Sequence, residues 1–60
     1  MEKIHVLLVE DEQTLAMIIK DTLEEQDFII TTAGDGEEGL RKFFEQKPDV
    51  LAVSYTHLTL

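Results

Sequence analysis

The stretch that most constrains this chain is an apolar run from Ile4 to Val9, which is followed at once by Glu10, Asp11 and Glu12. A short run of aliphatic and β-branched residues predicts a strand that is buried on both faces. Three carboxylates at the end of such a strand repel one another and resist the loss of water. They indicate either a solvated turn before a helix or an oxygen-ligand site for a hard cation such as Mg²⁺.

The chain continues with apolar residues at helical spacing and then with a second β-prone run. Residues 13–26 predict an amphipathic helix, because their apolar side chains recur three and four positions apart. Residues 28–32 are aromatic or β-branched and predict a second strand. The predicted buried face of the helix consists of Leu15, Ile18, Ile19, Thr22 and Leu23.

A glycine-rich turn precedes a second helical segment. Asp35 lies in this turn, where its side chain can cap a helix over residues 36–46. Pro48 ends that helix, because proline disfavours the helical conformation of the residue before it. Residues 50–53 predict a third short strand. The aromatic and aliphatic side chains of the second helix are predicted to lie in the core: Leu40, Phe43 and Phe44.

The order of elements is β-α-β-α-β, which indicates an α/β fold with right-handed crossovers and a parallel sheet. Ligands of such sheets bind beyond the carboxyl ends of the strands, where the strand order reverses. If the first strand lies between the other two, in the order 2-1-3, Glu10 and Asp11 lie at that point. Ser54 follows the third strand and is then expected beside them.

Composition narrows the possible partners and location. Thirteen acidic against five basic residues give a net charge of −8, which argues against nucleic acid or an anionic membrane as a direct partner. The absence of cysteine excludes a disulfide framework and a thiolate metal site. No apolar run is long enough to span a bilayer, and the N-terminus lacks a signal-peptide pattern. A cytoplasmic protein is therefore expected.

Three segments together resemble a known family. Residues 6–12 resemble the first strand and acidic pocket of response-regulator receiver domains, and residues 33–40 resemble the turn from their second strand into a helix. Residues 47–53 resemble the approach to their phosphoacceptor. Each motif is short, but the three occur in the order and at the spacing of the family, without a gap from Lys3 to Val53.

The resemblance implies the β-α-β-α-β half of a flavodoxin-like fold and a signalling module of a two-component phosphorelay, rather than an enzyme. In the family an aspartate after the third strand accepts a phosphoryl group from a sensor histidine kinase, with Mg²⁺ bridging the acidic pair and the phosphoryl group. Carried over to this chain, Asp11 would bind Mg²⁺ directly and Glu10 through water. Ser54 stands where the acceptor aspartate is expected.

The departure at Ser54 sets the predicted boundary. Residues 1–53 are predicted to form the N-terminal half of a receiver, without a phosphoacceptor and with weak or lost Mg²⁺ affinity. Residues 54–60 match no receiver pattern and resemble translated adapter or linker DNA, so a foreign origin is predicted. The alternative is a natural degenerate receiver that acts as an interaction module.

A second alternative is a nucleotide-binding module, because Gly34, Gly36 and Gly39 match the pattern G-x-G-x-x-G. In dinucleotide-binding folds this pattern follows the first strand, whereas here it follows the second. The acidic residues within the pattern would also repel a pyrophosphate. His5 is expected to be an ordinary strand residue, because no second histidine or cysteine is spaced to join it in a metal site.

Overall fold

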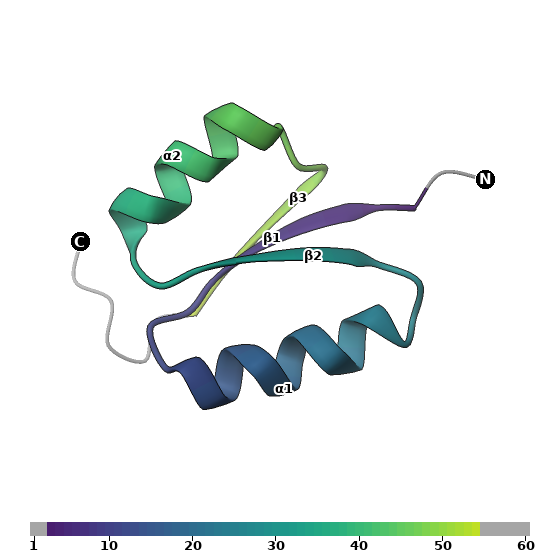
Figure 1. Cartoon of the computed structure of the whole chain (residues 1–60). Coiled ribbons are helices and arrows are strands. Elements are labelled where there is room, and N and C mark those ends of the chain that lie inside the picture. Colours follow the sequence, from purple (N-terminus) through teal and green to yellow (C-terminus); the bar gives the residue numbers. More distant parts are fainter. Residues whose placement is uncertain (1–2, 55–60) are drawn as a thin grey trace.

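Three parallel strands with one helix on each face make up the computed structural model, which describes residues 3–54 (Figure 1). The order of elements is the predicted one, and each strand is connected to the next through a helix. The elements are β1 (His5–Val9), α1 (Gln13–Glu24), β2 (Ile29–Ala33), α2 (Gly36–Gln46) and β3 (Val50–Val53). Within the described part of the chain, no helix has the length and apolar character needed to cross a membrane.

The sheet has the order β2-β1-β3, which confirms the predicted strand order. In the centre of the sheet, Leu7 pairs with Thr31 of β2 on one side and Leu51 of β3 on the other. The central strand is buried from Val6 to Val9, as a strand covered on both faces should be.

The first crossover differs slightly from the prediction. Helix α1 ends at Glu24 rather than at residue 26, because a tight turn follows in which Asp27 adopts a left-handed conformation with φ of 68°. Phe28 is part of this turn, because its N–H donates to the carbonyl of Leu23. Strand β2 therefore begins one residue later than predicted, at Ile29.

Helix α1 packs on one face of the sheet, but not through the whole predicted stripe. Ala16 is buried against the sheet, with Ile19 and Leu23 packed beside it. The prediction that Ile18 and Thr22 face the core is wrong, because both are exposed, Ile18 to 57%. A helix turns by about 100° per residue, so a contact stripe centred on Ala16 rotates Ile18 away from the sheet.

Helix α2 covers the opposite face through Gly39. A Cβ added at Gly39 would lie 2.6 Å from Cγ2 of Val9, so the glycine allows the helix to approach β1 closely. The prediction that Leu40 and Phe44 lie in the core is wrong, because they are 60% and 68% exposed. Phe43 is also exposed, with its ring edge-on to that of Phe44. The helix contacts β1 and β2, whereas Leu40 and Phe44 lie largely exposed to solvent.

Candidate functional site

The carboxyl ends of all three strands meet at one edge of the sheet. Val9 at the end of β1 is in register with Ala33 of β2 and Val53 of β3. The N–H of Glu10 donates to the carbonyl of Ala33 over 2.9 Å, and the N–H of Ser54 donates to the carbonyl of Val9 over 2.9 Å. The backbone ladder thus continues one residue beyond β1 and β3, and it brings Ser54 next to the start of the acidic run.

The two predicted metal ligands differ in their surroundings. Glu10 is only 2% exposed, and its Oε2 accepts a hydrogen bond of 2.9 Å from the N–H of Glu12. Asp11 is half-buried and is therefore the more accessible carboxylate. Burial of a carboxylate is costly unless hydrogen bonds compensate it. The bond from Glu12 gives Glu10 a part in shaping the turn into α1.

The donor set fits Mg²⁺ in kind. Carboxylate oxygens are the ligands that Mg²⁺ prefers, and one or two carboxylates are usual when substrate phosphates and waters complete its shell. Between residues 3 and 54, no group of three or more histidine, cysteine, aspartate or glutamate side chains is placed to hold a metal ion. Ser54 adds a neutral hydroxyl, not a third carboxylate, to this edge.

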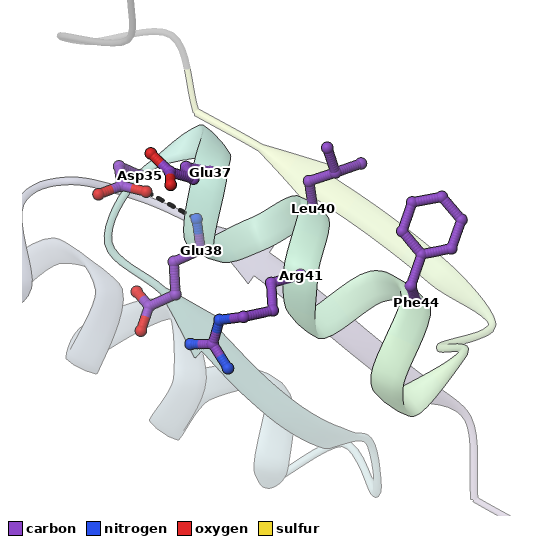
Figure 2. A pocket seen from close by; sticks show the side chains of 6 residues that line it. All are labelled: Asp35, Glu37, Glu38, Leu40, Arg41 and Phe44. Atoms are coloured by element: carbon purple, nitrogen blue, oxygen red, sulfur yellow. Dashed lines mark hydrogen bonds between the residues drawn. The ribbon is translucent and has the colours of Figure 1, made fainter.

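The turn after β2 is organised by two carboxylates. Asp35 caps α2 as predicted, because its Oδ1 accepts a hydrogen bond of 2.8 Å from the N–H of Glu38 (Figure 2). Oε1 of Glu38 in turn accepts a hydrogen bond from the N–H of Gly34. This bond, together with the positive charge of Lys42, holds the pKa of Glu38 below its usual range. The bond from Glu38 to Asp35 and the bond from Gly34 back to Glu38 together resemble a capping box.

This turn also bears on the nucleotide-binding alternative. A pyrophosphate at a helix N-terminus is bound by backbone N–H groups and favoured by the helix dipole. Here the N–H groups of Gly34 and Glu38 already donate to carboxylates of the chain itself. Gly39 is close to Val9 and serves the packing of helix on strand. These contacts give the glycine pattern a structural role and argue against an anion site.

A groove with a volume of about 440 Å³ runs beside Glu10 and past the outer edge of β2. Lys42 lines it, and its Nζ donates to the carbonyl of Thr32 over 2.7 Å while lying 3.5 Å from Oε2 of Glu38. Sequence reasoning missed this lysine. The spacing of Glu38 and Lys42 predicts an ion pair on one helix, but the contact with a strand carbonyl depends on how α2 lies over the sheet.

His5 takes part in a polar chain across the sheet rather than in a metal site. Its Nε2 lies 2.8 Å from Oγ1 of Thr31, and the Thr31 hydroxyl donates to Oε1 of Gln46 over 2.9 Å. Because the Thr31 hydroxyl proton is directed to Gln46, the imidazole must donate to Thr31. The contacts of His5 thus connect β1, β2 and the end of α2, in agreement with a structural role.

Comparisons with known proteins all point to one protein family. The model of the response regulator receiver domain matches residues 6–54. A probable chemotaxis protein CheY of Rhizobium etli is 44% identical over 54 residues, which cover 88% of this chain and 41% of that protein. The alkaline phosphatase synthesis transcriptional regulatory protein PhoP of Bacillus subtilis is 35% identical over 48 residues, which cover 80% of this chain and 20% of that protein.

The alignments span less than half the length of these curated relatives. No solved structure gives a significant match. The family match nevertheless covers most of the chain, includes the acidic run, and ends at Ser54, next to the strand edge described above. With its parallel β2-β1-β3 sheet, the chain belongs to the response regulator receiver domain family, the signalling modules of two-component systems.

Proposed function

We propose that this chain carries the acidic half of a phosphorelay site and does not itself accept a phosphoryl group. The observation that supports this most directly is the hydrogen bond from the N–H of Ser54 to the carbonyl of Val9. This bond holds Ser54 immediately after β3 and beside the acidic run. It supports the proposal, drawn from the family resemblance, that Ser54 occupies the position of the acceptor aspartate. The chain offers a serine hydroxyl at this position.

The chemistry of Ser54 differs from that of an aspartate in two ways. A carboxylate is already an anion and can attack a phosphorus atom directly, whereas a serine hydroxyl is a weak nucleophile until a base removes its proton. Glu10 lies at the start of the neighbouring acidic run, but its carboxylate already accepts a hydrogen bond from the N–H of Glu12. A serine also supplies no negative charge to hold a metal ion beside the incoming phosphoryl group.

Mg²⁺ binding is proposed to be weak. Asp11 is the direct ligand and Glu10 acts through a water molecule, in accordance with the greater accessibility of Asp11. When bound, Mg²⁺ would offset negative charge at this edge of the sheet. Two carboxylates without a third donor group compete poorly with the strongly held hydration shell of Mg²⁺.

The partners proposed for the chain follow from the family and from its charge. A sensor histidine kinase is the proposed phosphoryl donor of the longer protein to which a receiver of this type belongs. The net charge of −8 disfavours direct contact of this segment with nucleic acid or an anionic membrane, and a cytoplasmic location is proposed.

The boundary after Val53 stays a prediction, and residues 55–60 of the predicted foreign tail lie outside the described residues. Genomic sequence beyond codon 53 distinguishes the foreign tail from a natural degenerate receiver.

Phosphorylation is tested by incubation with Mg²⁺ and acetyl phosphate, followed by intact mass spectrometry. We expect no phosphoryl group on the unmodified chain or on Ser54→Ala, and partial incorporation on Ser54→Asp, which restores the carboxylate nucleophile. The proposal fails if the unmodified chain gains a phosphoryl group that Ser54→Ala does not.

Metal binding is tested by titration of backbone amide chemical shifts with MgCl₂. We expect changes confined to residues 9–13 with half-saturation at roughly millimolar Mg²⁺, and about tenfold tighter binding for Ser54→Asp, because ligand charge raises affinity. Asp11→Asn should abolish the changes. Saturation of the unmodified chain at micromolar Mg²⁺ would contradict the proposed incomplete site.

A further inference from the structure

The turn after β2 lies at an outer edge of the sheet, yet its backbone is held on both sides. No strand lies beyond β2 among the residues that the structure describes. Because the N–H and C=O groups along a strand point alternately to its two sides, the carbonyl of Ala33 points to β1 and the backbone groups of its two neighbours point outward. An edge strand ordinarily presents such outward groups unpaired.

Two side chains of α2 take the place of a neighbouring strand at this edge. Nζ of Lys42 donates to the outward carbonyl of Thr32 over 2.7 Å. Oε1 of Glu38 accepts a hydrogen bond from the outward N–H of Gly34. The two side chains are one helical turn apart, and their charged groups lie 3.5 Å from one another. Helix α2 therefore holds both the residue before Ala33 and the residue after it.

Ala33 connects this turn to the acidic run. Its carbonyl accepts a hydrogen bond of 2.9 Å from the N–H of Glu10, the first residue of that run. Ala33 and Glu10 are only 3% and 2% exposed, so little water reaches this bond. Oε2 of Glu10 in turn accepts a hydrogen bond from the N–H of Glu12. A series of hydrogen bonds thus leads from α2 through Ala33 to the carboxylates, and Lys42 and Glu10 line the same groove.

We propose that Lys42 and Glu38 are positioning residues for the Mg²⁺ site, which they hold in place by fixing the backbone on both sides of Ala33. The inference rests on the proposed function, in which Glu10 and Asp11 bind the metal ion. In this role neither positioning side chain contacts the metal ion. Groups that orient the ligands of a metal commonly lower its affinity by about 10–100-fold when they are lost. Because Ala33 is bonded to only one of the two ligands, we expect the lower end of this range.

Charge and position lead to opposite expectations for Lys42. A positive charge near a cation site repels the cation, so removal of a lysine that acted only through its charge would strengthen Mg²⁺ binding. Removal of a lysine that positions the ligands should weaken it. Arg41 is the matched control, because it precedes Lys42 on α2 and pairs with Glu45 in the described part of the chain. Arg41→Met therefore removes the same charge without changing the contacts of the turn.

Titration of the full chain with MgCl₂, followed by backbone amide chemical shifts of residues 9–13, tests the effect on the metal site. Lys42→Met should raise the half-saturating Mg²⁺ concentration about tenfold relative to Arg41→Met. Lys42→Arg keeps a donor and the charge, and it should restore the affinity of the unmodified chain. Glu38→Ala and Glu38→Gln form a second matched pair, because both lose the charge but only glutamine keeps an acceptor for Gly34. Glu38→Ala should bind Mg²⁺ about threefold more weakly than Glu38→Gln, or weaker still.

Amide hydrogen exchange without metal tests the positioning itself. The exchange rate of the Glu10 amide reports the opening of its bond to Ala33, whereas that of Leu8, a buried residue of the same strand, reports the opening of the sheet. A variant that only destabilises the fold raises both rates by the same factor. Lys42→Met should raise the rate of Glu10 at least about fivefold more than that of Leu8, and Arg41→Met should leave the ratio of the two rates unchanged.

The two measurements separate the failure of this proposal from the failure of the proposed function. If the unmodified chain shows no shift changes at residues 9–13 with MgCl₂, the proposed metal site fails, and the exchange of Glu10 alone decides whether α2 positions the acidic run. The positioning role is overturned if Lys42→Met leaves the ratio of the Glu10 and Leu8 exchange rates unchanged. It is also overturned if Lys42→Met binds Mg²⁺ as tightly as Arg41→Met or more tightly.

Discussion

The two outer strands of the sheet, β2 and β3, flank the same central strand yet are protected very differently. Both helices pack against β2, and its outward carbonyl at Thr32 accepts a hydrogen bond from Lys42. Neither helix covers β3 to a comparable extent in the described residues, and its apolar side chains are half exposed. The comparison shows that β2 is covered by the placement of both helices and bonded by one lysine, whereas β3, within the described residues, is not covered to that extent.

The same contrast separates the two sides of the functional site. The turn after β2 is held by hydrogen bonds from Gly34 and Glu38 to carboxylates. The residue after β3, Ser54, is held to β1 through the backbone. Of the two outer strands, β2 is thus followed by the more extensively hydrogen-bonded turn, and β3 is followed by the serine on which the proposed function depends.

The largest expected difference concerns packing on the two strands. Ile30 of β2 is buried in the core against Ala16, whereas Leu51 of β3 is half exposed. Ile30→Ala should lower the free energy of unfolding by about 2–5 kcal/mol, because it leaves a cavity. Leu51→Ala should lower it by less than about 1 kcal/mol. Urea denaturation monitored by circular dichroism at low micromolar protein measures both. Equal losses would show that β3 is covered in solution.

A smaller effect is expected when the protected edge is opened. Lys42→Met keeps the length of the side chain but removes the donor to Thr32, and it should cost about 1 kcal/mol. Arg41→Met is the matched control, because Arg41 is exposed on the same helix and pairs only with Glu45 within the described residues. A loss for Lys42→Met no larger than that for Arg41→Met would show that the bond from Lys42 to Thr32 does not stabilise this edge of the sheet.

The smallest expected effect is a pH dependence confined to the β2 side. The hydrogen bond from Gly34 and the charge of Lys42 lower the pKa of Glu38 in the folded chain. Because this pKa is lower in the folded chain than in the unfolded chain, ionised Glu38 stabilises the fold at pH values above its unfolded pKa. That stabilisation is lost as the pH falls through its folded pKa.

We therefore expect the unmodified chain to unfold at higher urea than Glu38→Gln at neutral pH. The difference should shrink as the pH falls below the ordinary pKa of glutamate, about 4.3, and on through the lower pKa that Glu38 has in the folded chain. Glu37→Gln is the control, because Glu37 is an exposed neighbour in the same turn of α2. A difference that is constant from neutral to acidic pH would assign the effect of Glu38→Gln to its shape and not to its charge.

Much of the fold could be predicted from local sequence patterns. The bounds of α2 and β3 agree with the prediction, and Asp35 caps α2 as expected. The strand order follows from a rule about crossovers and from the family resemblance, and it was also confirmed. The juxtaposition of Ser54 with the acidic run followed from the same order. These features depend on a few neighbouring residues or on chain connectivity.

The exposure of particular side chains could not be predicted in this way. Leu40, Phe44 and Ile18 have the spacing of core residues and are nevertheless exposed. Helical periodicity identifies an apolar face, but it does not state which part of that face another element covers. In this chain Gly39 and Ala16 decide the lines of contact, because their small size allows the closest approach to the sheet.

The sequence by itself determined the order of elements, the parallel sheet and the acidic edge with Ser54 beside it, since these depend on residue type, spacing and chain connectivity. Only the tertiary structure decided that Glu10 is buried and bonded to Glu12, and that Lys42 reaches the carbonyl of Thr32. It also decided that, within residues 3–54, the helices cover β2 more than β3. These contacts depend on how the helices lie over the sheet. A shift of helix position by one residue would change all of them without changing the pattern of apolar and polar residues.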